Sequence, residues 1–206
     1  MTRSESGVRA IEFWFDFAST YSYPAAMRLA DAAATARVPV IWRAMLLGPI
    51  FQAQGWNDSP FNVYPAKGRY MWHDMQRLCR EFGLPYARPS EFPRNGLLAA
   101  RVACACDDDP RLGSFVRAVF TANFVRDEDI ADHAIVRSCL EAAGIEPAEP
   151  VNRAQSPAVK QLLRERTATA AQAGIFGAPT FRVDGELFWG NERLAAAITA
   201  AGSGSA

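Results

Sequence analysis

Strand patterns are confined to the two ends of this chain, and this division limits its possible folds more than any other feature. Residues Ala10–Phe17 place an isoleucine and phenylalanines at alternate positions and predict a buried strand. After a polar turn comes an alanine-rich helix, from about Tyr21 to Ala36. A second apolar strand spans Val38–Met45. Strand, helix and strand in this order form a βαβ unit, whose crossover is right-handed in nearly all proteins.

The second strand region lies near the C-terminus. A Ser-Pro helix start at Ser156 predicts a helix that ends near Ala173. Two short strands, Thr180–Asp184 and Glu186–Trp189, flank an Asp-Gly pair, which is the signal for a type I′ hairpin turn. A last helix is expected over about 191–200. This end of the chain therefore has the order αββα.

The interval between the two ends is predicted to be helical. A stretch rich in glycine and proline, 47–66, interrupts the pattern, and helices without a strand follow over about 71–82, 95–106, 109–124 and 132–143. This order predicts an α/β chain, a thioredoxin fold with an all-helical domain inserted in its middle. The expected boundaries are a thioredoxin-like domain over 10–62 and 152–200, a helical domain over 63–151, and flexible tails at 1–9 and 201–206.

A proline turn near the C-terminus supports this fold. Gly177-Ala178-Pro179-Thr180 leads directly into a strand; its proline bond is a candidate for the cis form, and a trans proline that starts the strand is an equal alternative. In thioredoxin-like proteins this proline faces the loop after the first strand, where redox members carry C-x-x-C. Here that loop is Ser19-Thr20-Tyr21-Ser22, so thiol–disulfide exchange by the protein itself is excluded at this site. A hydroxyl at a helix N-terminus remains. It favours an anion, or is a plain helix cap.

Composition excludes several other functions. Basic and acidic side chains number 22 each, so the formal net charge is zero and no overall field attracts nucleic acid. No apolar run is long enough to span a membrane, and the polar N-terminus does not resemble a signal peptide, so we expect a cytoplasmic protein without a membrane partner. Four irregularly spaced cysteines indicate buried thiols rather than disulfides. The two histidines have no partner at metal-ligand spacing, so no metal site is expected.

Four blocks of the sequence resemble one known family. F-W-F-D-F-A-S-T-Y-S-Y at Phe13–Tyr23, P-A-K-G-R-Y-M-W at Pro65–Trp72, G-A-P-T at Gly177–Thr180 and F-W-G-N-E-R-L at Phe188–Leu194 resemble the 2-hydroxychromene-2-carboxylate isomerase family and the related kappa-class glutathione transferases. The likeness implies a thioredoxin domain with a helical insertion, reduced glutathione as cofactor, and a homodimer. By motif match, Ser19 is the catalytic serine whose hydroxyl bonds to the glutathione sulfur and stabilises its thiolate.

The resemblance also implies which residues hold glutathione. The backbone of Ala178, before Pro179, pairs with the cysteinyl part, and the block Trp189-Gly190-Asn191-Glu192 holds the γ-glutamyl end. Relatives often have aspartate in place of Glu192. That residue and Asn191 are also explained as first-turn and cap residues of the last helix. Asn57 stands near a glutathione-contacting asparagine of the relatives.

The substrate is expected to be a small aromatic molecule. Lys67 can pair with a carboxylate of glutathione or of the substrate, or it is a solvated surface lysine. The resemblance also suggests an aromatic pocket, whose expected lining residues are Tyr21, Tyr70, Trp72 and Phe124; packing in the core is the alternative for each.

Three functions remain open. The first is an isomerase of 2-hydroxychromene-2-carboxylate-type aromatic enol-pyruvates in aromatic compound degradation. The second is a kappa-class-like transferase that releases a glutathione conjugate, and the third is a non-catalytic module that binds glutathione or a partner. The family commonly has S-P-Y-S in its first loop, whereas this chain has Thr20 in place of the proline, and we expect a less rigid loop.

Overall fold

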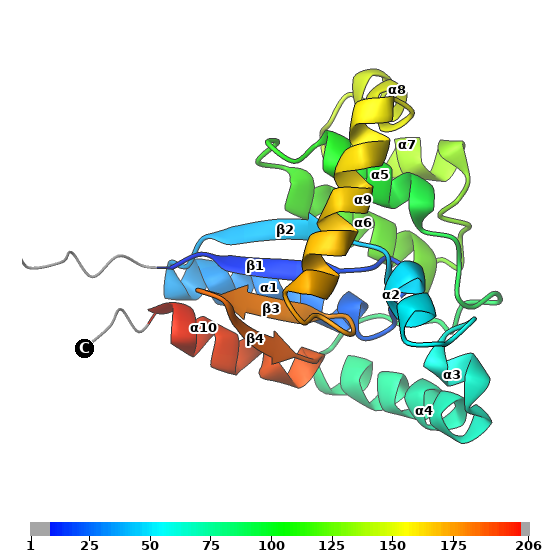
Figure 1. Ribbon diagram of the computed structural model, residues 1–206, viewed down its shortest axis with the longest axis vertical. Coiled ribbons are helices and arrows are strands. Elements are labelled where there is room, and N and C mark those ends of the chain that lie inside the picture. Colours follow the sequence, from blue (N-terminus) through cyan, green and yellow to red (C-terminus); the bar gives the residue numbers. More distant parts are fainter. Residues whose placement is uncertain (1–8, 203–206) are drawn as a thin grey trace, which may run out of the picture.

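A computed structural model describes residues 9–202, and within them the strands form one sheet (Figure 1). The sheet order is β2-β1-β3-β4. β1 pairs in parallel with β2 and antiparallel with β3, so Phe13 lies opposite both Trp42 and Phe181. The two ends of the chain therefore meet in one sheet, as the βαβ and αββα units predict. The strands are β1 (Ile11–Phe15), β2 (Val40–Ala44), β3 (Thr180–Val183) and β4 (Glu186–Trp189).

Helices fill the long interval between β2 and β3. This interval holds the insertion, and α9 then leads back to the sheet. The helices are α1 (Ser22–Ala36), α2 (Leu47–Ala53), α3 (Pro60–Val63), α4 (Pro65–Glu81), α5 (Leu97–Ala105), α6 (Leu112–Phe124), α7 (His133–Ala142), α8 (Ala148–Ala154), α9 (Pro157–Gln172), the 3₁₀ turn η1 (Asn191–Arg193) and α10 (Leu194–Gly202).

Different helices cover the two faces of the sheet (Figure 1). Phe13 and Phe15 share one buried cluster with Leu29 of α1, on the face that α1 and α10 cover. Trp14 lies between them in sequence and points to the other face, where it shares a second cluster with Ala170 of α9. Because successive residues of a strand point to opposite faces, β1 is apolar on both sides and is the central strand of the core.

The helical insertion and the sheet share one core. Phe120 of α6 has its ring centroid 6.0 Å from that of Phe15 and 5.2 Å from that of Phe17. Phe115, one turn earlier, contacts Phe17 edge to face. These aromatic contacts continue the sheet core into the insertion, so the end of β1 is held from both sides.

Several details differ from the prediction. Helix α4 begins at Pro65 rather than near 71, and the 3₁₀ turn η1 occupies the start of the expected last helix. The stretch 47–66 holds α2 and α3, because Ser59 caps α3 and Pro60 starts it, a helix signal inside an irregular region. A further short helix, α8, lies between α7 and α9. Residues 201 and 202 belong to α10 rather than to a tail, and the Arg9 N–H donates to the carbonyl of Ala201 (3.2 Å). The expected tails at 1–9 and 201–206 otherwise lie outside the described residues.

The cysteines occupy the core. All four are free and buried, as their places in apolar helical patterns indicate. Burial raises the pKa of each thiol to about 11, which favours the protonated form at neutral pH. Separately, no helix within residues 9–202 is both long and apolar enough to cross a membrane.

Candidate active site

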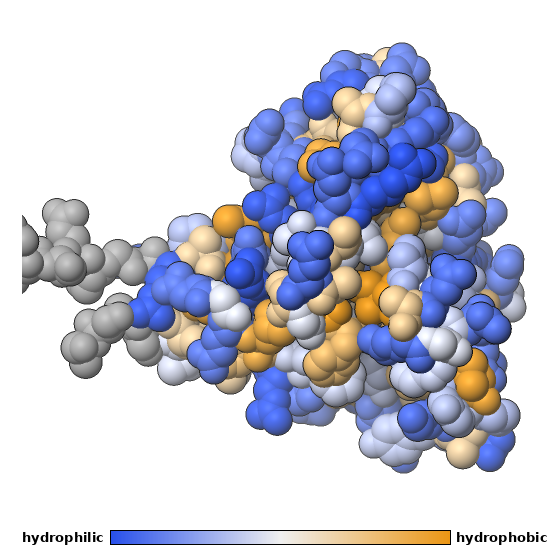
Figure 2. Space-filling view, viewed as in Figure 1, coloured by the Kyte–Doolittle hydropathy of each residue, from blue (hydrophilic) through white to orange (hydrophobic). Residues whose placement is uncertain are grey.

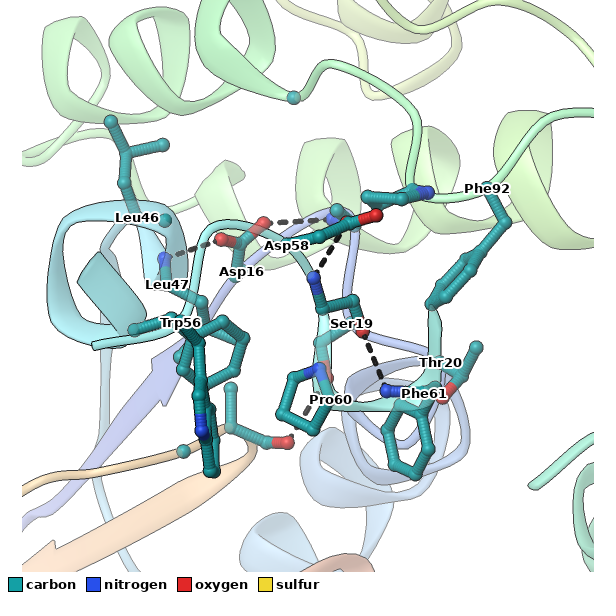
Figure 3. A pocket seen from close by; sticks show the side chains of 18 of the residues that line it. Asp16, Ser19, Thr20, Leu46, Leu47, Trp56, Asp58, Pro60, Phe61 and Phe92 are labelled. Atoms are coloured by element: carbon teal, nitrogen blue, oxygen red, sulfur yellow. Dashed lines mark hydrogen bonds between the residues drawn. The ribbon is translucent and has the colours of Figure 1, made fainter. Parts of the chain in front are cut away.

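A large cavity opens where β1 ends and the helical insertion begins. Its volume is about 1300 Å³. The loop after β1 lines one wall, α2, α3 and the start of α4 line another, and the cis-proline turn and Trp189 complete it. Figure 3 shows Asp16 and Ser19 beside Trp56, Pro60 and Phe61, residues that lie far apart in the sequence. The topology therefore brings the serine turn, 19–22, and the proline turn, 177–180, into one site.

Ser19 lies at the base of this cavity. Its hydroxyl donates to the carbonyl oxygen of Ala178 (3.0 Å), and its N–H donates to the carbonyl of Asp16 (3.0 Å). Helix α1 begins later, at Ser22, and its N-cap residue Tyr21 makes no capping bond with its side chain. The alternative interpretation of Ser19 as a helix cap is therefore wrong, because its hydroxyl is bonded to the proline turn.

The proline turn has the cis form, one of the two forms that the sequence allows. The Ala178–Pro179 peptide bond is cis. Ala178 lines the cavity and its carbonyl accepts the Ser19 hydroxyl. The N–H of Ala178 has no hydrogen-bond partner among the residues that the structure describes. The Ala178 peptide unit therefore resembles the edge of a sheet, with one donor and one acceptor close to the cavity.

Asp16 is a buried carboxylate that the sequence did not single out. It lines the cavity with 7% of its surface exposed, and its oxygens accept the N–H groups of Ala18 (2.8 Å) and Leu47 (2.7 Å). No ion pair joins it to a basic side chain within residues 9–202. Burial raises the pKa of Asp16, and the two backbone hydrogen bonds oppose that rise. An acidic residue at the end of an apolar strand was the signal that could have identified it.

The serine turn is anchored to helix α4. The Thr20 hydroxyl, almost completely buried, donates to the sulfur of Met71 (3.1 Å). The Tyr21 hydroxyl donates to Asp74 (3.0 Å), and burial, followed by the charge of Asp74, raises the pKa of Tyr21. Thr20 thus supplies a hydrogen bond at the position where relatives have a proline.

Three predicted residues line the cavity from the helical side. Asn57, Lys67 and Tyr70 all contribute to its wall. The Lys67 ammonium is exposed and lies 4.6 Å from the centroid of the Tyr64 ring. Tyr21, also predicted, lines the cavity from the serine turn.

Two aromatic residues predicted for the pocket do not line it. Phe124 is completely buried, with its ring 5.7 Å from that of Tyr23 and 6.3 Å from that of Phe120. Trp72 packs edge to face on Phe92, and the Arg88 guanidinium lies 4.6 Å from its centroid. Both residues lie on helix faces that turn toward the protein interior, so the packing alternative applies to them.

Of the predicted glutathione-binding residues 189–192, only Trp189 lines the cavity. The Trp189 indole lines the cavity and lies against Gly177, where an added Cβ would be 2.7 Å from the ring nitrogen. Gly190, Asn191 and Glu192 follow it but do not line the cavity. Asn191 is buried and accepts a hydrogen bond from Arg28 (3.1 Å) rather than capping a helix. The Glu192 carboxylate folds back over Gly190, and its charge contributes to the raised pKa of Tyr21.

Further aromatic residues complete the wall. Phe51 and Trp56 form a tilted pair (5.6 Å), and Phe176 packs edge to face on Trp189 (4.7 Å). With the tyrosines already described, these rings make the cavity suited to planar apolar molecules. The lining aromatics that the sequence analysis missed are Phe51, Trp56, Phe61, Phe92 and Phe176.

Arg94 lines the cavity but is already engaged. Its guanidinium donates to the carbonyl and side-chain oxygens of Asn123 (3.2 Å each) and forms an ion pair with Asp127. Asn123 in turn donates to the carbonyl of Phe17 (3.0 Å). Among the cavity-lining residues that the structure describes, Lys67 is therefore the basic side chain without a carboxylate partner.

A second, smaller cavity lies on the other side of α2. It has a volume of about 570 Å³ between α2 and α9, and its walls are mostly apolar. Figure 2 shows hydrophobic surface gathered in the hollow between these two helices. No three histidine, cysteine, aspartate or glutamate side chains in the described part of the chain come together as a metal site.

The chain matches known proteins over most of its length. Residues 10–199 match the family described as a DSBA-like thioredoxin domain. The chain is 30% identical over 188 residues to 2-hydroxychromene-2-carboxylate isomerase of Sphingobium xenophagum, covering 90% of this chain and 94% of the relative. It is 28% identical over 200 residues to glutathione S-transferase kappa 1 of Rattus norvegicus, covering 90% and 88%. A solved structure of 2-hydroxychromene-2-carboxylate isomerase has a TM-score of 0.83 at 25% identity, covering 94% of each chain.

Proposed function

The chain belongs to the DSBA-like thioredoxin domain family and, within it, to the family that holds the 2-hydroxychromene-2-carboxylate isomerases and the kappa-class glutathione transferases, and from this premise we propose that it is a glutathione-dependent isomerase. Its substrates are 2-hydroxychromene-2-carboxylate-type aromatic enol-pyruvates. The observation that carries the proposal is the Ser19 hydroxyl beside the Ala178 carbonyl, at the base of an aromatic cavity. The proposal includes a cytoplasmic homodimer that acts in the degradation of aromatic compounds.

The residues of the cavity fit glutathione. The Ala178 peptide offers a donor and an acceptor to the cysteinyl backbone, and Lys67 offers a cation to a carboxylate. The γ-glutamyl end lies against Trp189 and extends beyond the cavity to Gly190, Asn191 and Glu192, where the Glu192 carboxylate turns from Gly190 to the ammonium group. Asn57 contacts the tripeptide from the opposite wall. The positive end of α1 and the Ser19 hydroxyl favour the thiolate over the thiol.

When bound, glutathione would supply a thiolate for reversible addition to the conjugated side chain of the substrate, which would allow rotation about the former double bond before elimination restores it. Ser19 donates a hydrogen bond to the sulfur and is not itself a nucleophile. Lys67 holds the substrate carboxylate or the developing enolate, and this charge stabilisation is greatest where water is excluded. Tyr21 and Tyr70 lie against the aromatic ring and orient it.

The relative from Rattus norvegicus supports one alternative, a transferase that releases a glutathione conjugate. The two activities differ in whether glutathione is consumed. The protein is incubated with glutathione and an aromatic enol-pyruvate, and free thiol is measured against turnover. Constant free thiol is expected for the isomerase, and loss in proportion to turnover identifies the transferase. If binding is detected but neither product forms, the non-catalytic module remains.

The role of Ser19 is tested with a matched pair of serines. Ser19→Ala is expected to raise the pKa of the bound thiol by about one unit, because the donor to sulfur is lost. At a pH below the thiol pKa this is about a tenfold loss of thiolate. Ser22→Ala is the control, since the Ser22 hydroxyl is buried in the same turn without a hydrogen-bond partner. The ultraviolet absorbance of the thiolate, titrated against pH, measures both. Equal titrations in the two variants would reject the role of Ser19.

A further inference from the structure

The Ser19 hydroxyl has a hydrogen-bond acceptor before any ligand binds. It carries one proton and donates it to the Ala178 carbonyl at 3.0 Å. To stabilise a thiolate, it must donate that same proton to sulfur, because a hydroxyl supplies one donor. The hydrogen bond to Ala178 must therefore break or weaken when Ser19 performs its proposed role.

Breaking that bond has a cost that depends on the ligand. A carbonyl left without a donor in a partly buried turn is unfavourable. The cost is removed if the ligand gives Ala178 a new donor as it arrives. The cysteinyl amide N–H of glutathione is such a donor, and the Ala178 N–H, which has no partner among residues 9–202, can donate to the ligand's carbonyl in return.

We propose that Ser19 exchanges its hydroxyl between the Ala178 carbonyl and the ligand sulfur, and that Ala178 thereby selects thiols whose cysteine nitrogen carries an amide N–H. This inference rests on the proposed glutathione-dependent function and adds its thiol specificity. A thiol without that N–H leaves the hydroxyl on Ala178 and is not activated. Ala178 is thus a specificity-determining residue that acts through its backbone.

The test uses glutathione and an analogue in which an ester oxygen replaces the cysteinyl N–H. The pKa of each thiol is measured free in solution and bound, in the wild-type protein and in Ser19→Ala. For glutathione we expect the wild-type protein to lower the thiol pKa by about one unit more than Ser19→Ala does. For the ester analogue we expect the thiol pKa in the two proteins to differ by less than about a third of the difference seen with glutathione. The double cycle of ligand and substitution isolates this coupling between Ser19 and the cysteinyl N–H.

A second measurement follows the hydroxyl directly. In a crystal structure of the glutathione complex, Ser19 Oγ is expected within hydrogen-bond distance of sulfur, with the cysteinyl N–H on the Ala178 carbonyl. Ser19 Oγ still bonded to Ala178 in that complex overturns the exchange. Equal Ser19-dependent pKa lowering for both ligands also overturns it, while the glutathione function stands. Glutathione that produces no thermal shift at millimolar concentration overturns both.

Discussion

Ser19 and Ser22 carry the same side chain at the two ends of one turn, and the structure gives them different surroundings. The Ser19 hydroxyl reaches across the cavity base to Ala178, whereas the Ser22 hydroxyl is completely buried and unpartnered. In redox relatives both positions of a C-x-x-C turn are cysteines. In this chain only the first of these two positions lines the cavity, and the second is buried in the packing of the turn.

Asp16 gives a prediction at the same scale. Burial raises its pKa above the ordinary value of 3.8, so the folded state binds the proton more tightly than the unfolded state. The contribution of Asp16 to stability is therefore greatest below pH 3.8 and declines as the pH rises through the raised pKa. Asp16→Asn removes this titration. The melting temperature of the variant relative to wild type is expected to increase from pH 4 to pH 7.

Thermal unfolding in a pH series measures this difference. The asparagine amide has one acceptor oxygen and loses one of the two hydrogen bonds from Ala18 and Leu47, which shifts the melting temperature by the same amount at every pH. The informative quantity is therefore how the difference in melting temperature changes with pH. If the melting temperatures of the two proteins change in parallel with pH across the series, the raised pKa of Asp16 is contradicted.

At the scale of elements, α3 and α4 form one wall of the cavity because they approach closely at Gly68. This glycine is buried, and a Cβ added to it would collide with the carbonyl oxygen of Phe61. Phe61 and Lys67, on either side of the contact, both line the cavity. The separation of the two helices therefore sets the position of Lys67.

Gly68→Ala is expected to destabilise the protein by about 1–3 kcal/mol, since backbone must move to admit the methyl group. This loss exceeds the gain of up to about 1 kcal/mol from helix propensity. For a chain of this size the melting temperature falls by roughly 2–4 °C per kcal/mol. Glutathione binding is expected to weaken as well.

The matched control is Gly48→Ala in α2. Apart from its chain neighbours, nothing lies within 4 Å of a Cβ at this position, and the pre-proline restriction at Gly48 offsets the gain in helix propensity, so the substitution is expected to change the free energy of unfolding by less than about 0.5 kcal/mol. A clear loss of stability in Gly68→Ala alone supports the close approach, and a Gly68→Ala variant as stable as Gly48→Ala would rule it out.

At the scale of the whole molecule, the helical insertion and the sheet are joined through Asn123. This side chain is 2% exposed and lies near the end of α6. It accepts from Arg94 and donates to the carbonyl of Phe17, two residues before Ser19. One amide thus links the insertion, the 91–97 loop and the serine turn.

Asn123→Ala leaves these buried groups without their partner, and we expect the free energy of unfolding to fall by about 2 kcal/mol. Urea denaturation measures it. Thr121→Ala on the same helix is the control, because the Thr121 hydroxyl bonds only within its own helix (2.8 Å to the Arg117 carbonyl), and it should change stability by less than about 0.5 kcal/mol. Equal effects of the two substitutions would show that the link does not stabilise the fold.

The sequence by itself determined the order of strands and helices along the chain, the helical insertion and the family. The periods of apolar residues in β1 and β2 and the Asp-Gly turn between β3 and β4 are local signals, and local signals fix elements. The comparisons confirm both the fold and the family resemblance inferred from four blocks. Motif match predicts Ser19, Lys67, Tyr70 and Ala178 as site residues, and all four line the cavity. A motif identifies such residues because it fixes their positions along the chain.

Only the tertiary structure decided which side chains meet in the cavity. The thioredoxin-like order predicts that the Ser19 and Ala178 turns face each other, but only the structure shows that the Ser19 hydroxyl donates to the Ala178 carbonyl, 159 residues away. It also shows that the carboxylate of Asp16 accepts from Leu47, 31 residues later. Phe124 and Tyr70 are both helical aromatics, yet the first is fully buried and the second is 61% exposed. A helix pattern shows that one face is apolar, but packing against α1 and the sheet decides which residues that face buries and which it leaves to the cavity.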